Sequence, residues 1–329
     1  MLLIVTVSLI LFIIALFLSK RLSPKYVKID GKHVVITGGS SGIGKSLAIQ
    51  AAQLGANVSI LARDKVKLET AKTEIQGYLQ SGRKVHCESC DLSGDFENVR
   101  TVIQEAESRL GPVFMLVNSA GSSVSRSFVD LKASDFKNMM EMNYYSAINA
   151  TKAAIPSMVE QQCGRIVFLS SQAGQIGLFG FSAYSGAKFA LRGMAEALQM
   201  EMTPHNIRVT VSFPPDTDTP GFHSELKSGK PKETIMISET AGLFKAEDVA
   251  KTILSDSLKG KFLSYVGLDG WMLATMTSGM SAATSALEVV TQFFLLGLLR
   301  VIGLFYLSSF DRIVLQCKKE RDAEKPKSS

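Results

Sequence analysis

The sequence predicts an α/β fold, a single domain built on a doubly wound parallel sheet, with apolar segments near both ends of the chain. Two observations support this prediction. Between residues 30 and 267, short apolar runs alternate with amphipathic stretches of helical periodicity, which is the pattern of repeated βαβ units. The polar motifs follow the apolar runs directly. They should therefore meet at the carboxyl edge of the sheet, where such folds bind ligands.

The predicted elements alternate regularly, with helices on both faces of the sheet because crossovers between parallel strands are right-handed. The longest predicted helix carries Asn143 and should be interrupted near Pro156, since proline removes a helix hydrogen bond. Strands are predicted over residues 34–37, 57–62, 85–87, 114–117, 165–169, 207–213 and 262–266, and helices over 43–54, 64–80, 96–110, 134–161, 182–202 and 248–257.

Residues 214–245 break this alternation. The segment begins with two prolines and continues as a polar stretch that contains Gly229 and Pro231. A connection of this length in a compact domain is typical of a lid or binding loop, and a disordered surface insertion is the alternative. We predict a lid over the substrate.

The first 25 residues are predicted to be a membrane anchor. Hydrophobic residues make up 46% of the 329-residue chain, and residues 2–18 carry no charge. As a helix they would span about 25 Å. A cleaved signal peptide is the alternative, but a basic start and a small-residue cleavage site are lacking. The basic residues that follow place the domain in the cytosol, because positive flanks stay on that side. They are Lys20, Arg21, Lys25 and Lys28.

A second apolar region covers residues 270–310 and is predicted to associate with the membrane. Residues 289–310 are apolar except for Gln292, Arg300 and a few hydroxyls, and residues 271–287 are weakly apolar. Three interpretations remain open. The region forms two short membrane passes, or an interfacial helix with Arg300 reaching toward water, or a soluble helix that joins a homodimer.

The remaining residues, 311–329, are predicted to be a polar cytosolic tail. The chain ends in Lys325-Pro326-Lys327-Ser328-Ser329, which resembles a dilysine retrieval signal of the endoplasmic reticulum. The net charge of +6 comes largely from the flanks of the apolar segments, and no long basic stripe carries interleaved aromatic residues. This pattern fits a membrane surface and argues against nucleic acid as a partner.

The cysteines do not predict a metal site. Cys87 and Cys90 have a redox or zinc spacing, but no second Cys/His pair is in register with them. We expect reduced thiols that act as small buried side chains, as in the cytosol.

A glycine-rich turn follows the first predicted strand. Its glycines let the backbone approach a pyrophosphate, and the turn points a helix N-terminus at the anion. The same residues fit a hydrolase pattern with Ser40 as nucleophile. We reject it because the turn follows the first strand and no acid–histidine pair has a suitable context. The predicted dinucleotide-binding residues of the turn are Gly38, Ser40, Ser41, Gly42, Ile43 and Gly44.

Tyr184 and Lys188 lie four residues apart in a predicted helix, so their side chains share one face. A nearby cation favours an ionised phenol, and we expect Lys188 to lower the Tyr184 pKa from about 10. This is a general acid/base arrangement. Thirteen residues upstream, Ser171 follows a strand, with Ser170 as its neighbour and competitor.

Together the glycine turn, Asn118-Ser119-Ala120-Gly121, Ser171 and the Tyr184–Lys188 pair resemble the short-chain dehydrogenase/reductase family over about residues 30–265. The resemblance implies a Rossmann-like fold and hydride transfer between a nicotinamide cofactor and a carbonyl. It implies that Tyr184 donates the proton, that Lys188 binds the nicotinamide ribose and lowers the Tyr184 pKa, and that Ser171 binds and polarises the substrate carbonyl.

The family resemblance also implies roles away from the tyrosine. Asn143 holds a water in the proton relay, Asp91 lies beside the adenine, and Asn118 supports the central strand. Thr217 and Thr219 lie at the carboxamide, although Pro215 replaces a family glycine before them and makes the turn more rigid. Ser119 replaces a family asparagine.

The end of the second strand predicts NADPH. NAD enzymes of this kind place an acid there to bind the ribose hydroxyl. Here Arg63 stands at that end, with Lys67 one turn into the next helix. Two cations favour a 2′-phosphate. Asp64 is the alternative, if the register slips by two residues.

Three segments, 164–175, 177–181 and 214–222, resemble family members that reduce long-chain ketosphingoid bases at the endoplasmic reticulum membrane. Attachment at both ends would hold the active site where an insoluble lipid lies. A membrane-anchored steroid or retinoid dehydrogenase of the same family remains an alternative. A scaffold that binds NADPH or lipid without turnover is the alternative from another class.

Overall fold

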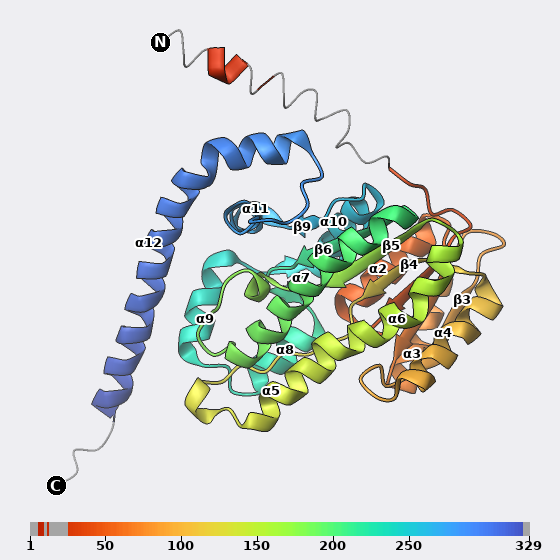
Figure 1. Ribbon diagram of the computed structural model, residues 1–329. Coiled ribbons are helices and arrows are strands. Elements are labelled where there is room, and N and C mark those ends of the chain that lie inside the picture. The colour runs from red at the N-terminus through yellow and green to blue at the C-terminus, as the bar shows by residue number, and fades with distance from the viewer. Residues whose placement is uncertain (1–5, 10–11, 13–25, 325–329) are drawn as a thin grey trace.

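The computed structural model describes residues 6–9, 12 and 26–324 (Figure 1). Most of the predicted N-terminal anchor and the predicted retrieval signal lie outside these residues. The strands of the main sheet are β1 (His33–Thr37), β2 (Asn57–Ala62), β3 (Val85–Ser89), β4 (Val113–Asn118), β5 (Gly164–Leu169), β6 (Ile207–Phe213) and β9 (Leu263–Tyr265), and a small second sheet pairs β7 (Thr217–Asp218) with β8 (Phe244–Lys245).

The main sheet has seven strands in the order β3-β2-β1-β4-β5-β6-β9, and every pair is parallel. This confirms the predicted doubly wound fold. The strand order reverses between β1 and β4, and a crevice at that point is the usual ligand site of such sheets.

Helices cover both faces of the sheet, as the alternation of elements predicts (Figure 1). The helices are α2 (Gly42–Gln53), α3 (Lys65–Gln76), α4 (Phe96–Leu110), α5 (Ala133–Met140), α6 (Ser146–Glu160), α7 (Ser182–Met202), α8 (Pro220–Lys227), α9 (Lys232–Ser238), α10 (Ala246–Leu258), α11 (Gly267–Met276) and α12 (Ala286–Glu324).

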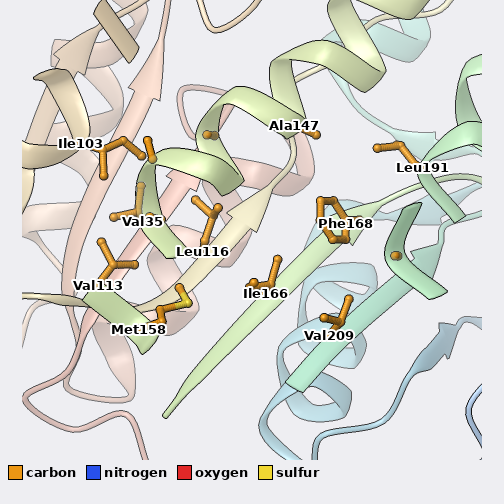
Figure 2. Packing of buried hydrophobic residues seen from close by; sticks show 14 of the residues in the cluster. Val35, Ile103, Val113, Leu116, Ala147, Met158, Ile166, Phe168, Leu191 and Val209 are labelled. Atoms are coloured by element: carbon orange, nitrogen blue, oxygen red, sulfur yellow. The ribbon is translucent and has the colours of Figure 1, made fainter. Parts of the chain in front are cut away.

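The core has two layers because successive strand residues point to opposite faces. In β1, Val35 packs toward α4, α6 and α7, whereas Val34 and Ile36 pack toward α2, α3 and α10. Figure 2 shows the first layer, where Leu116 and Ile166 from neighbouring strands lie close to residues of the covering helices. The sheet is therefore a rigid base for residues at its carboxyl edge.

The helix predicted over residues 134–161 is interrupted, but not near Pro156. It divides into α5 and α6 at a π-helical turn (Glu141–Tyr145), and α6 runs through Pro156. A π turn widens the helix and disturbs its hydrogen bonds. Here the side-chain amide Nδ2 of Asn143 donates to the carbonyl oxygen of Met139 at 3.0 Å. The interruption therefore lies at a predicted site residue.

The predicted lid is folded, so the alternative of a disordered insertion is wrong. It contains β7, α8, α9 and β8. Thr219 caps α8 by accepting a 3.1 Å hydrogen bond from the amide of Phe222. The segment is held in place by its own secondary structure.

The C-terminal apolar region forms α11 and α12 rather than two similar passes. The ten-residue α11 packs against β9 and α12. Among the described residues, α12 is the one helix long and apolar enough to cross a membrane. It continues without a break to Glu324, so residues 311–324 of the predicted tail are helical.

Candidate active site

One cavity of about 780 Å³ gathers the predicted site residues at the carboxyl edge of the sheet. Its lining includes the glycine turn, Arg63, Lys67 and Asp91 at one end and the serine, tyrosine and lysine at the other. Asn143, Thr217 and Thr219 also line it. Asn118 does not. It is buried below the cavity, where its Nδ2 donates to the hydroxyl of Thr151 at 3.0 Å.

The glycine turn can accommodate a dinucleotide phosphate. Gly38 has a φ of +66°, and a Cβ there would lie 2.9 Å from the backbone nitrogen of Ala120. Gly42 has a φ of +54° and lies against the side chain of Thr219. These positions require glycine for conformation and for space. The turn leads into α2, whose N-terminus favours an anion.

Thr37 is a functional residue that the sequence analysis missed. Its hydroxyl oxygen accepts hydrogen bonds from the amides of Ser119 at 3.0 Å and Ala120 at 3.1 Å. These bonds fix the segment after β4 against the glycine turn after β1. Thr37 stands next to the turn in sequence, but nothing in the sequence shows that it pairs with residues more than 80 positions away.

The cofactor end of the cavity carries the two predicted cations. Strand β2 ends at Ala62, so the register slip that would make Asp64 the ribose ligand does not occur. Instead the carboxylate of Asp64 caps α3 by accepting from the amides of Val66 and Lys67 at 3.0 and 3.1 Å. The same carboxylate lies 3.6 Å from the Nζ of Lys67, and Arg63, Asp64 and Lys67 all line this end of the cavity.

Asp91 lies at the same end with an ionised side chain. Its carboxylate accepts a 2.7 Å hydrogen bond from the hydroxyl of Ser93 and a further bond from the Ser93 amide. The Ser93 hydroxyl, with a smaller contribution from the positive charge of Arg63, lowers the pKa of Asp91.

Tyr184 and Lys188 lie on the same face of α7, as the spacing predicts. The Nζ of Lys188 lies 5.5 Å from the centre of the Tyr184 ring. Burial raises the pKa of Tyr184, and a hydrogen bond with Ser171 opposes that rise. Burial also lowers the pKa of Lys188 to about 7. The predicted fall in the Tyr184 pKa is therefore not found, because burial is the largest influence on it and raises it.

The Tyr184 phenol is protonated at neutral pH. A free phenol, with a pKa of about 10, is protonated there too, and the rise in pKa preserves this state. This is the protonation state that a ketone reductase needs.

The two neighbouring serines have different environments. Both residues line the cavity, but the hydroxyl of Ser170 is buried and donates to the backbone carbonyl of Lys188 at 2.9 Å. The hydroxyl of Ser171 lines the cavity, hydrogen-bonds with Tyr184 and accepts from the amide of Ala173 at 3.1 Å. Ser170 is therefore structural, and Ser171 is the residue available to a substrate.

Asn143 lies next to Lys188 across Gly121. A Cβ on Gly121 would lie 2.5 Å from the Asn143 Oδ1 and 3.7 Å from the Lys188 Nζ. The Asn143 Nδ2 donates to the backbone carbonyl of Ser122 at 2.9 Å, whereas its buried Oδ1 has no hydrogen-bond partner among the described residues. Such an oxygen is suited to a bound water.

The sequence analysis also missed a buried charge cluster in the lid. Lys230, whose side chain is 1% exposed, lies 2.9 Å from a carboxylate oxygen of Glu225 and 3.8 Å from one of Asp216. Both acids line the cavity and raise the pKa of Tyr184 by their charge. Burial raises the pKa of Asp216, with the charge of Lys230 opposing that rise, and Glu225 is the closer partner of Lys230. In sequence these residues read only as a polar stretch.

This fold and site define a short-chain dehydrogenase, and the chain belongs to that family: the short chain dehydrogenase family model matches residues 32–229. Membership implies a nicotinamide cofactor, and the glycine turn fits one. Among the described residues, no group of three or more His, Cys, Asp or Glu side chains is arranged to hold a metal ion.

The similarity to individual proteins extends beyond this domain. The chain is 50% identical over 324 residues to the 3-dehydrosphinganine reductase of Danio rerio, covering 98% of this chain and 97% of that protein. It is 49% identical over 323 residues to the 3-ketodihydrosphingosine reductase of Bos taurus, with the same coverage. Identity to a 3-dehydrosphinganine reductase of Arabidopsis thaliana is 40% over 305 residues, or 90% of this chain and 89% of that one.

Among solved structures, levodione reductase matches with a TM-score of 0.67 and 22% identity, over 75% of this chain and 99% of that chain. At this level of identity the match shows a shared fold.

Proposed function

We propose that this chain reduces 3-dehydrosphinganine to sphinganine with NADPH, at the endoplasmic reticulum membrane, with its catalytic domain in the cytosol. One observation carries the proposal. Over 98% of its length, the chain shares about half of its residues with a reductase that is named for this substrate. The family match ends at residue 229, but this similarity includes the C-terminal helices.

The site supports a simple proton path for the reduction. When bound, NADPH supplies the hydride. Ser171 donates a hydrogen bond to the carbonyl oxygen and holds it against Tyr184. As the oxygen gains negative charge, Tyr184 gives it the phenolic proton and the hydroxyl product forms. Lys188 and a water at Asn143 then return a proton to Tyr184.

The cations at the end of β2 support NADPH over NADH. Arg63 and Lys67 line the cavity beside the glycine turn. Asp64 lines it too, but its carboxylate caps α3 and lies 3.6 Å from the Nζ of Lys67. A 2′-phosphate carries the negative charge that two such cations attract.

The lid cluster supports an amino ketone over the alternative substrates. In 3-dehydrosphinganine the amine is bonded to the carbon next to the carbonyl. The protein group that binds this amine must therefore lie beside Tyr184. The carboxyl groups of Asp216 and Glu225 lie there, in the cavity that contains Tyr184, and can accept hydrogen bonds from an ammonium. A steroid ketone or retinal carries no amine to pair with them.

The proposal is tested with detergent-solubilised protein, NADPH and 3-dehydrosphinganine, by following the loss of nicotinamide absorbance. Parallel reactions contain NADH, a ketosteroid or retinal, and Tyr184→Phe is the blank. We expect turnover of the sphingoid ketone with NADPH and none in the variant. Turnover of the steroid or retinal alone would overturn the substrate. Binding of NADPH without turnover of any ketone would favour the scaffold.

The proposed membrane topology is tested separately. Protease treatment of intact microsomes should remove tags placed at the C-terminus, because the tail is proposed to be cytosolic. A protected C-terminal tag would contradict both the cytosolic tail and the retrieval signal.

A further inference from the structure

The active-site cavity extends beyond the catalytic residues to the C-terminal helices. Met272 and Met276 of α11 line its far end, together with Gly303, Tyr306 and Phe310 of α12. A helix with the length and apolarity of a membrane span therefore forms part of the wall of the same cavity that contains Tyr184.

The three cavity-lining residues of α12 are spaced three and four positions apart, so they lie on one face of the helix. Gly303 is buried, and a Cβ there would lie 3.1 Å from the sulfur of Met276. The two helices thus approach closely at Gly303. Other apolar side chains of α12 are exposed, among them Phe305 at 72% and Phe293 at 63%. The helix has an inner face toward the cavity and an apolar outer face suited to lipid.

The cavity meets α12 near the end of its apolar part. No charged residue lies between Arg300 and Asp311. Tyr306 and Phe310 stand just before the charges begin, and aromatic residues are typical of the membrane–water boundary. Beyond that point α12 packs against the lid, where Glu320 pairs with Lys232 of α9 at 2.6 Å. This end of the cavity therefore lies where the apolar part of α12 gives way to its charged part.

We infer that the alkyl chain of the substrate lies in the part of the cavity that α11 and α12 line, with Met276, Gly303, Tyr306 and Phe310 as its contacts, so that the apolar C-terminal helix is part of the substrate-binding site. This inference rests on the proposed function, because it takes a long-chain ketone as the substrate. The polar head lies at Ser171 and Tyr184, and the chain extends through the apolar end of the cavity toward lipid.

The inference is tested by the preference for long over short chains. The full-length protein in one detergent receives a mixture of a long-chain and a short-chain 3-ketosphingoid base, and the ratio of the two kcat/KM values is measured. Gly303→Leu adds a side chain to the cavity wall where α12 meets Met276 of α11. Gly297→Leu is the matched control on the same helix, because a Cβ there would meet no atom within 4 Å.

We expect Gly303→Leu to lower the long-to-short ratio about tenfold, which corresponds to lost contact with about two methylene groups. Gly297→Leu should leave the ratio within about twofold of wild type. Retained turnover of the short substrate shows that the variant is folded. Should Gly303→Leu lose both activities, Phe310→Ala decides the question, with the exposed Phe305→Ala as its control.

The inference would be overturned if Gly303→Leu retains short-chain turnover with an unchanged long-to-short ratio. It would also be overturned if the ratio falls equally in Gly297→Leu. Equal ratios in the two phenylalanine variants would overturn it as well. If the wild type turns over neither sphingoid ketone, the proposed function fails instead, so the two failures are distinguishable.

Discussion

The Nζ of Lys188 donates a 2.8 Å hydrogen bond to the backbone carbonyl of Leu169, the last residue of β5. The bond joins the helix that carries Tyr184 to the strand that leads into Ser171. It holds the ammonium of a buried residue at a fixed distance from the phenol. Since burial lowers the Lys188 pKa to about 7, the charge of this group changes within the neutral pH range.

This lowered pKa predicts that stability rises with pH. Above about pH 7 the folded protein has lost the Lys188 proton, whereas the unfolded chain keeps it up to about pH 10. The unfolded state binds more protons in this window, so the free energy of unfolding increases with pH. We expect Lys188→Met to remove that contribution. The Tm of the wild type relative to the variant, measured in detergent, should rise between about pH 7 and pH 9. A constant difference would contradict the prediction.

Substitution of the two adjacent serines should have different effects: loss of Ser171 should lower activity, and loss of Ser170 should lower stability. Ser171→Ala removes the hydrogen-bond donor to the substrate oxygen, and kcat should fall about 100-fold. Ser170→Ala removes a buried hydrogen bond to the Lys188 carbonyl, so it should cost about 1–2 kcal/mol of stability while kcat changes only a few-fold. Steady-state kinetics and thermal unfolding of both variants check this. A larger loss of kcat in Ser170→Ala than in Ser171→Ala would reverse the assignment.

The cations beside β2 should determine the choice of cofactor. Arg63→Ala should raise the KM for NADPH about tenfold, because a charged hydrogen bond to the 2′-phosphate is lost. The KM for NADH should stay nearly unchanged. Lys65→Ala is the control, since Lys65 begins α3 but does not line the cavity. The measurement is the ratio of kcat/KM for the two cofactors. Equal loss with NADPH and NADH would exclude a specific phosphate contact.

The stability of the protein should depend on Lys230, the one lysine of the charge cluster formed with Glu225 and Asp216. Lys230→Met leaves the carboxylates of Glu225 and Asp216 close together without their counter-charge. Breaking a buried ion pair in this way costs about 3–5 kcal/mol. Adding Glu225→Gln should restore most of the lost stability, because the uncompensated charge is removed. Thermal unfolding of the single and double variants tests this, and equal Tm values for the two would show that the charges do not interact.

Much of the site was accessible from sequence because its motifs are local. The turn at Gly38 and the i, i+4 spacing of Tyr184 and Lys188 depend on neighbouring residues alone. The interruption of the long helix was placed wrongly at Pro156. The sequence signal for proline is strong, whereas the π turn contains Asn143, whose side chain bonds to the distant Ser122 carbonyl, a contact that the sequence does not show.

By itself, the sequence determined the parallel doubly wound sheet, the glycine turn and the pairing of Tyr184 with Lys188 on one helix face, since hydrophobic periodicity and short motifs are encoded in neighbouring positions. Only the tertiary structure decided which charges are buried together and which helices meet. It placed Lys230 between two acids beside Tyr184, raised the Tyr184 pKa by burial, and set Gly303 of α12 against Met276. These properties depend on contacts between residues far apart in the chain, and such contacts exist only after packing excludes water.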